Sequence, residues 1–197
     1  MMAKKLSWLT LCALLPLVLA MGCGEQGKVE QGRVIAFDKA KETVTFIVDT
    51  KHDTANPDYS GAPLTFVLPK DPMERGEDAK AGMRMKLDTK GREIVIYDPA
   101  TKGMKKIAYT LIDQKENVAK NSPLVVEKKF PIVDKEKKAI TIYSGRQKLL
   151  VTFSVPEEYL ALPANTWEAG DEVRVYYKEP GKAARFMNIT RTDIFKK

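Results

Sequence analysis

Short segments of alternating apolar and polar residues, separated by polar turns, run through the chain from Gly32 onward. The segments are rich in β-branched and aromatic residues, which favour strands, and the turns hold aspartate and glycine, which suit tight connections. The predicted strands cover residues 33–37, 43–48, 64–68, 83–87, 93–97, 106–112, 129–133, 139–143, 149–155, 172–177 and 185–190. This pattern predicts an all-β protein built of antiparallel hairpins.

Three blocks of the first half recur in the same order in the second half. The matching pairs are 38–45 with 134–141, 65–69 with 152–156, and Ala81-Gly82 with Ala169-Gly170. Hairpins with polar turns can look alike by chance, but the three offsets are similar, at 96, 87 and 88 residues. The shared order therefore favours an internal duplication.

Each half holds five or six predicted strands in roughly 80 to 90 residues, which suits a small barrel. We therefore predict two tandem small antiparallel β-barrels, similar to OB or SH3-like folds, at residues 32–113 and 128–197. A polar stretch that includes the Ser122-Pro123 break predicts a linker at 114–127. The resemblance is architectural and implies no activity.

The N-terminus has the pattern of an export signal. Lys4 and Lys5 precede an uncharged apolar run from Leu6 to Met21, which ends in a polar, glycine-rich stretch. The run is too short and ends too abruptly for a membrane-spanning helix. It predicts a signal peptide at residues 1–22.

The tetrapeptide Ala20-Met21-Gly22-Cys23 resembles the lipobox of bacterial lipoproteins, although leucine is more usual where Ala20 stands. This resemblance implies cleavage before Cys23, lipidation of its thiol, and a short tether at residues 23–31. The alternative is an ordinary signal peptide that leaves Cys23 as a free thiol, which is unusual in an exported chain. Cys12 would leave with the leader, so the mature chain could form no internal disulfide.

Lipidation at Cys23 predicts a protein of the cell envelope that is tethered to a membrane without spanning it, since two or more acyl chains anchor stably. In many lipoproteins of diderm bacteria, an aspartate after the cysteine marks retention in the inner membrane. Gly24 stands at that position. The resemblance therefore implies the periplasmic face of the outer membrane.

Charge and composition argue against several classes of function. From Cys23 onward, 31 Lys and Arg face 26 Asp and Glu, and the two signs alternate along the chain. That pattern is typical of a solvated surface, so no nucleic-acid partner is expected. Nucleophilic hydrolysis is also disfavoured, because the chain has one histidine and no nucleophile elbow, phosphate-binding glycine loop or paired-cysteine motif. We predict a protein that is not an enzyme and has no cofactor.

One loop could hold a divalent cation by composition. It lies between residues 49 and 63 and contains Asp49, His52, Asp53 and Asp58. The group lacks the alternating spacing and terminal glutamate of a calcium loop, and one histidine does not make a zinc site. An exposed, turn-rich loop accounts for the same residues without a metal.

Aromatic residues give a second candidate site, because barrels of this kind can bind ligands through exposed rings. The candidates are Tyr59, Trp167, Tyr176 and Tyr177. Neighbouring residues of a strand point to opposite faces, so Tyr176 or Tyr177 must point outward. Trp167 is expected to plug one end of a barrel.

The leading functional hypothesis is a membrane-anchored envelope lipoprotein that acts as a non-enzymatic binding or adaptor module for another envelope protein. The combination of an anchor, a duplicated β body and missing catalytic groups leads to it. The alternative is a protein that binds a small ligand or glycan in the groove between the two barrels or on an exposed aromatic face.

Overall fold

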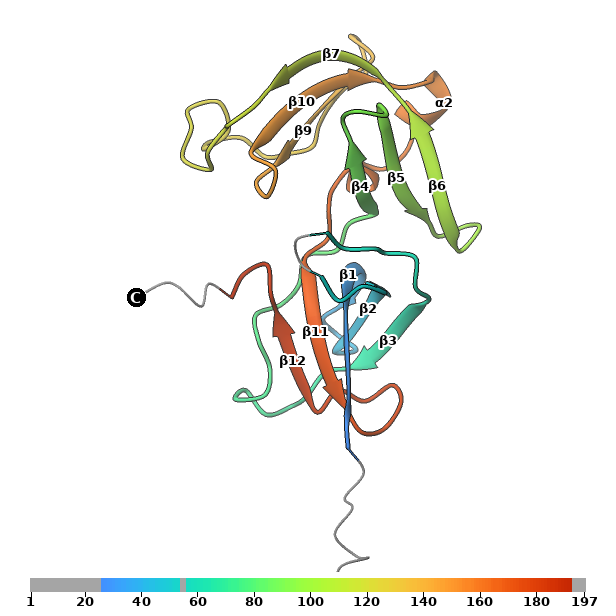
Figure 1. Ribbon diagram of the computed structural model, residues 1–197, viewed down its shortest axis with the longest axis vertical. Helices are drawn as coiled ribbons and strands as arrows, with labels where there is room; N and C mark the ends of the chain where they lie inside the picture. Colours follow the sequence, from blue (N-terminus) through green and yellow to red (C-terminus); the bar gives the residue numbers. More distant parts are fainter. Residues whose placement is uncertain (1–25, 54–55, 193–197) are drawn as a thin grey trace, which may run out of the picture.

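The computed structural model describes residues 26–53 and 56–192, and these residues form an all-β molecule (Figure 1). The strands are β1 Lys28–Asp38, β2 Thr43–Val48, β3 Pro63–Val67, β4 Arg84–Asp88, β5 Glu93–Asp98, β6 Gly103–Ala108, β7 Thr110–Lys115, β8 Ile132–Asp134, β9 Ala139–Ser144, β10 Leu149–Ser154, β11 Glu172–Tyr177 and β12 Arg185–Asn188. Two short helices, α2 Glu157–Leu160 and the 3-10 helix η1 Ala164–Thr166, lie between β10 and β11. Every predicted strand overlaps an observed one, so the all-β prediction is confirmed.

Strand pairing follows a different plan from the predicted tandem arrangement. One sheet has the order β12-β11-β1-β2-β3, so the first three strands and the last two form one body. We call it the terminal body, residues 26–82 and 168–192. Residues 83–167 form the inserted body, whose sheets have the orders β4-β5-β6 and β7-β10-β9-β8 (Figure 1). Residues 114–127, predicted as a linker, lie inside this body.

The predicted closed barrels are wrong, because the described strands form open sheets, and their pairing does not show a duplication. The turn after β1 fixes only its pairing with β2, and the other edge of β1 needs a partner as well. β11 meets that edge in an unbroken register, from Lys28↔Tyr177 to Arg33↔Glu172. The predicted halves therefore share one sheet.

Five hairpin turns share one chemistry, which explains why blocks 38–45 and 134–141 look alike. In each turn an aspartate or serine side chain accepts backbone N–H groups two or three residues later, as when Asp88 Oδ1 accepts from Lys90 at 3.0 Å and Gly91 at 2.8 Å. Four residues after it comes a non-glycine residue with positive φ. These turns span residues 38–42, 88–92, 98–102, 134–138 and 144–148. The likeness reflects a recurring turn.

The terminal body has an apolar core on one face of its sheet, with Val34, Phe46, Phe66, Val175 and Phe186 among the buried members. Its two edge strands are covered by other parts of the chain. Beside β3, Val67 bonds to the loop between β11 and β12, and beside β12 the segment 74–76 forms a parallel bridge. No long strand edge of this body is left free for pairing among these described residues.

The inserted body is built around one strand that serves two sheets. β6 pairs with β5, β7 pairs with β10, and only Tyr109 separates β6 from β7. The Tyr109 ring turns into the core and packs on Phe153, with ring centroids 5.0 Å apart. The bent strand folds the two sheets over a shared core that also holds Ile94, Ile140 and Trp167.

The junction between the bodies is packed and hydrogen-bonded. Ile35, Ile47 and Tyr59 of the terminal body form a cluster with Met85 and Tyr97 of the inserted body. The chain passes from one body to the other twice, through residues 79–84 and again through residues 165–171. We call these the first and second crossing segments, and both contact the middle of β1. The backbone of Val34 donates to Asp171 at 2.9 Å and accepts from Gly82 at 3.1 Å. The two bodies are therefore joined as one unit.

Candidate functional site

The four aromatic candidates lie in different environments. Tyr59 is buried at the junction beneath the Arg33 guanidinium, whose carbon lies 4.4 Å from the ring centroid. Trp167 is fully buried in the inserted body. Tyr177 packs on Phe66 in the terminal core.

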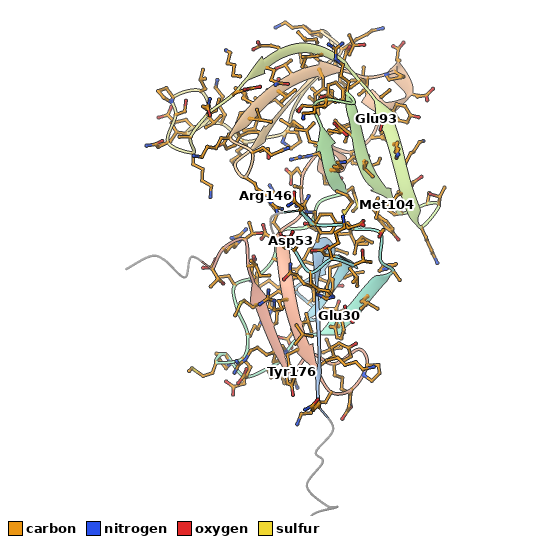
Figure 2. All side chains as sticks on the ribbon, in the orientation of Figure 1. Glu30, Asp53, Glu93, Met104, Arg146 and Tyr176 are labelled. Carbon is orange, nitrogen blue, oxygen red and sulfur yellow. The ribbon has the colours of Figure 1, made fainter. Side chains whose placement is uncertain are left out.

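Tyr176 is the outward-pointing residue of its strand and covers the backbone of Gly27 at the far end of the terminal body (Figure 2). The structure therefore does not bring the four rings together, and Tyr59, Trp167 and Tyr177 pack in three different apolar clusters. They do not form a shared aromatic face for a ligand.

The predicted metal-binding residues serve the loop itself. Asp49 is buried, and its Oδ1 accepts hydrogen bonds from the backbone N–H groups of Lys51 at 3.1 Å and Asp58 at 2.7 Å. His52 is exposed and has a φ of 51°. Among residues 26–53 and 56–192, no group of three His, Cys, Asp or Glu side chains could hold a metal ion. The geometry gives Asp49 a structural role in the loop.

Charged groups that are far apart in the sequence meet in the junction. Gln31 Nε2 donates to Glu172 Oε1 at 2.9 Å, and Gln31 Oε1 accepts from Arg174 Nη2 at 2.7 Å. Arg146 extends from the turn between β9 and β10 to the terminal body, where its Nη1 lies 3.7 Å from Glu172 Oε2 (Figure 2). Burial raises the pKa of Glu172, and Arg146 opposes that shift.

Two arginines hold the first crossing segment in place. Arg33 Nη1 donates to the carbonyl of Met85 at 2.7 Å, and Arg84 Nε donates to the carbonyl of Trp167 at 2.9 Å. Burial lowers the pKa of both guanidinium groups, that of Arg84 to about 10. Arg33 bonds to the backbone across the junction, and Arg84 joins the two crossing segments to each other, so we assign both arginines to stability.

A cavity of about 350 Å³ lies on the inserted body, close to the junction. Its walls come from the β5–β6 hairpin, from the segment that holds α2 and η1, and from Met83 at the first crossing. The apolar wall residues are Met83, Ile96, Pro99, Leu162 and Pro163, and the polar or aromatic ones are Tyr97, Asp98, Lys105, Glu158, Tyr159, Asn165 and Thr166. Ligand sites commonly combine apolar walls with a few polar groups in a hollow of this size.

A second hollow, of about 110 Å³, lies between the bodies and is lined by Phe130, Tyr143 and Trp167 among others. Like the larger cavity, it is lined by residues of both segments that the sequence predicted as barrels. A water molecule takes up about 30 Å³, so this hollow has room for about four waters.

A family model described as a domain of unknown function, DUF4881, matches residues 25–197. The chain belongs to this family. A search of curated proteins and a search of solved structures found no match.

The DUF4881 match covers both bodies and begins two residues after Cys23. Cys23 and the predicted leader lie outside the described residues. In the part of the chain that the structure describes, no helix is long and apolar enough to cross a membrane.

Charge is divided unequally between the two bodies of this DUF4881 chain. The inserted body has 16 Lys and Arg against 10 Asp and Glu, whereas the described terminal body has 13 against 14. Several of the surplus cations gather at the tip of the β9–β10 hairpin. Lys115 is paired with Leu150, the carbonyl of Lys148 accepts from Val118, and Lys120 packs against Gly145.

Exposed Lys128 and Lys129 follow in the same loop. We call Lys115, Lys120, Lys128, Lys129 and Lys148 the basic surface. Sequence reasoning missed this surface because it weighed charge along the whole chain instead of body by body. It also missed the cavity, because Lys105 and Glu158 belong to no local motif. The sequence signal for the basic surface is the surplus of lysine between residues 102 and 148.

Proposed function

We propose that this chain is a membrane-anchored envelope lipoprotein and that it acts as a non-enzymatic adaptor for an acidic envelope protein. The observation that carries the proposal is the division of charge between the two bodies. The inserted body has a net charge of +6 and the described terminal body a net charge of −1.

The anchor in this proposal is a lipid on Cys23, on the periplasmic face of the outer membrane. Four residues lie between Cys23 and Lys28, the first residue of β1, and an extended chain from Cys23 to Lys28 spans at most about 18 Å. β1 begins at the end of the terminal body that is opposite the inserted body (Figure 1). A lipid on Cys23 would therefore hold the terminal body near the membrane and present the inserted body away from it.

This orientation favours a protein partner over the anchoring membrane. Headgroups of that membrane would face the terminal body, whose charges are nearly balanced, while the basic surface would face outward. Clustered positive charge speeds encounters with an acidic partner and selects against basic ones. Within the basic surface, Lys115 pairs with Asp113 at 3.7 Å. The other four lysines have no ion pair among the described residues, unlike Lys182, which pairs with Glu179 at 2.7 Å.

Cross-linking followed by capture of the lipidated protein from detergent-solubilised membranes tests the adaptor role. The test variant reverses the charge of Lys120, Lys128 and Lys148 by substitution with Glu. The matched control reverses Lys51, Lys70 and Lys178, which are exposed lysines of the terminal body. We expect the wild type and the control to recover one acidic protein, the test variant to lose most of it, and the yield to fall as NaCl rises.

Equal recovery by the test variant would overturn the adaptor role, and so would recovery of lipid or polysaccharide without a protein. The anchor has its own test, the variant Cys23→Ser. We expect the wild type in the membrane fraction and the variant in soluble form. A wild-type protein that keeps its leader and fractionates like the variant would contradict lipidation.

A further inference from the structure

The cavity beside the junction has the size of a small metabolite. Its volume of about 350 Å³ equals the space of about twelve water molecules. A ligand of about 10 to 15 non-hydrogen atoms would fill it. The apolar wall residues named above would contact the body of such a ligand.

Two opposite charges at the rim are available to a ligand. The Lys105 ammonium lies 4.7 Å from the centre of the Tyr159 ring, and among the described residues it has no carboxylate partner. Glu158 is exposed and has no ion pair in the same part of the chain, whereas its neighbour Glu157 pairs with Lys138 at 3.4 Å. The rim therefore offers one cation and one anion.

The other carboxylate at the cavity is already engaged in a turn. Asp98 Oδ1 accepts from the backbone of Ala100 at 3.0 Å, and its Oδ2 accepts from the Thr101 hydroxyl at 3.1 Å. Asn165 adds an amide that can donate and accept hydrogen bonds. Besides its hydroxyl groups and Asp98, the cavity thus offers one ammonium, one carboxylate and one amide beside its apolar wall.

The wall made by residues 156–166 is held in place without a ligand. Pro156 and Pro163 precede the two short helices, and their carbonyls accept from Tyr159 and Thr166 at 2.9 Å each. Leu160 and Trp167 anchor the segment in the core. Because the wall is already ordered, a ligand would lose little free energy in organising the site.

We infer that this cavity binds a free amino acid with a large apolar side chain. Lys105 receives the α-carboxylate, Glu158 receives the α-ammonium, and the side chain fills the space beside Ile96, Met83 and Leu162. This role is separate from the proposed adaptor function, because the cavity contains none of the residues of the basic surface.

Isothermal titration of the full-length protein in detergent with L-phenylalanine and with L-leucine tests this inference. We expect both to bind, and we expect phenylacetate and phenethylamine to bind about tenfold or more weakly, because each lacks one of the two charges. The variants Lys105→Met and Glu158→Gln should each weaken the binding of phenylalanine by a similar factor. Circular dichroism establishes that the variants are folded.

Matched controls come from the adjacent residues of the same elements. Lys106 follows Lys105 on β6 and Glu157 precedes Glu158 in α2, and neither lines the cavity. Lys106→Gln and Glu157→Gln should bind phenylalanine like the wild type. Failure of both amino acids to bind at millimolar concentration would overturn the inference, as would equal binding of phenylacetate or equal loss in the control variants.

Discussion

The terminal body and the inserted body differ in how the chain builds them. The terminal sheet joins β1 to β11, so residues more than 140 positions apart share hydrogen bonds, as Gln31 and Glu172 do. The inserted body is made from one continuous stretch, and most of its pairs are hairpins. The terminal body also has nearly balanced charge, while the inserted body has the surplus cations and the cavity.

This contrast suggests a different role for each body: the terminal body supports the fold, and the inserted body contacts other molecules. The body that depends on both ends of the chain has its edges covered, and its Glu172 carboxylate is paired at the junction with Gln31 and Arg146. The body made from a single stretch presents the groups that a partner or ligand could meet. The predictions below test whether the two bodies are as different, and as firmly joined, as this division requires.

The largest expected effect comes from removing a core ring in either body. Phe46→Ala in the terminal core and Phe153→Ala in the inserted core should each lower the free energy of unfolding by about 3 to 5 kcal/mol. Urea unfolding followed by the fluorescence of Trp167, the one tryptophan after Trp8, measures the inserted body. Because the junction is packed, we expect both variants to shift this transition.

Val67→Ala serves as the control. Because Val67 is half exposed, this substitution should lower the free energy of unfolding only slightly. A Trp167 transition that stays in place in Phe46→Ala would mean that the bodies unfold separately. That outcome would break the description of the molecule as one unit.

Removing the buried carboxylate of the junction should have the next largest effect. Glu172→Ala leaves the buried Gln31 amide without its acceptor and removes the partner of Arg146, at a cost of about 1 to 3 kcal/mol. Glu168→Ala is the matched control, because its ion pair with the half-exposed Lys80 should contribute less than about 1 kcal/mol. Equal losses in the two variants by urea unfolding would contradict a special role for the junction.

The pH dependence of stability should distinguish the junction from the turns. Burial raises the pKa of Glu172 above 4.5, so the folded state keeps the proton to a higher pH than the unfolded state. The resulting stability is complete below the unfolded pKa and is lost as the pH rises through the folded pKa. We expect the stability of the wild type relative to Glu172→Gln to fall as the pH rises above 4.5.

Asp38 and Asp88 shift the other way, because backbone N–H groups of their turns lower the pKa of each. Their contribution is present above the unfolded value of 3.8 and is lost as the pH falls through the folded pKa. The two pH windows are therefore distinct. A stability difference between wild type and Glu172→Gln that stays constant from pH 4 to 7 would show that the junction carboxylate does not titrate with folding.

The smallest effect concerns the positive-φ residues of the turns. Lys148 has a φ of 51° and Glu42 a φ of 52°, conformations that glycine adopts more easily. Lys148→Gly should stabilise the protein by up to about 1 kcal/mol. Glu42→Gly should stabilise the protein less, because it also removes the ion pair of Glu42 with Arg75 at 2.7 Å. Thermal melting of both variants measures the difference, and a larger gain in Glu42→Gly would be the contrary result.

Sequence reasoning located the strands because each depends on local alternation and on turn residues a few positions away. It could not find the pairing of β1 with β11, since a contact across about 140 residues leaves no periodic trace. The apparent repeats have local causes as well. The turn blocks share an Asx-type turn, and the Ala81-Gly82 and Ala169-Gly170 pairs meet in space, where Met83 forms a bridge with Ala169.

The candidate site was less accessible from the sequence. Lys105 and Glu158 are 53 positions apart and come together only when α2 folds back beside β6. Aromatic residues drew the prediction to Tyr59 and Trp167, which the cores of the junction and of the inserted body required. An aromatic side chain alone does not reveal whether it will be buried.

Gly82 and Gly170 lie back to back where the chain enters and leaves the inserted body. A Cβ on Gly82 would come within 2.7 Å of the Gly170 nitrogen, and one on Gly170 within 1.9 Å of the Val34 carbonyl oxygen. The entry and exit points are thus neighbours, and a short link between them would leave the terminal sheet complete. Evolution could therefore exchange or enlarge the segment between residues 82 and 170 and keep the strand pairing of the terminal sheet, as long as the new segment still covers Ile35, Ile47 and Tyr59.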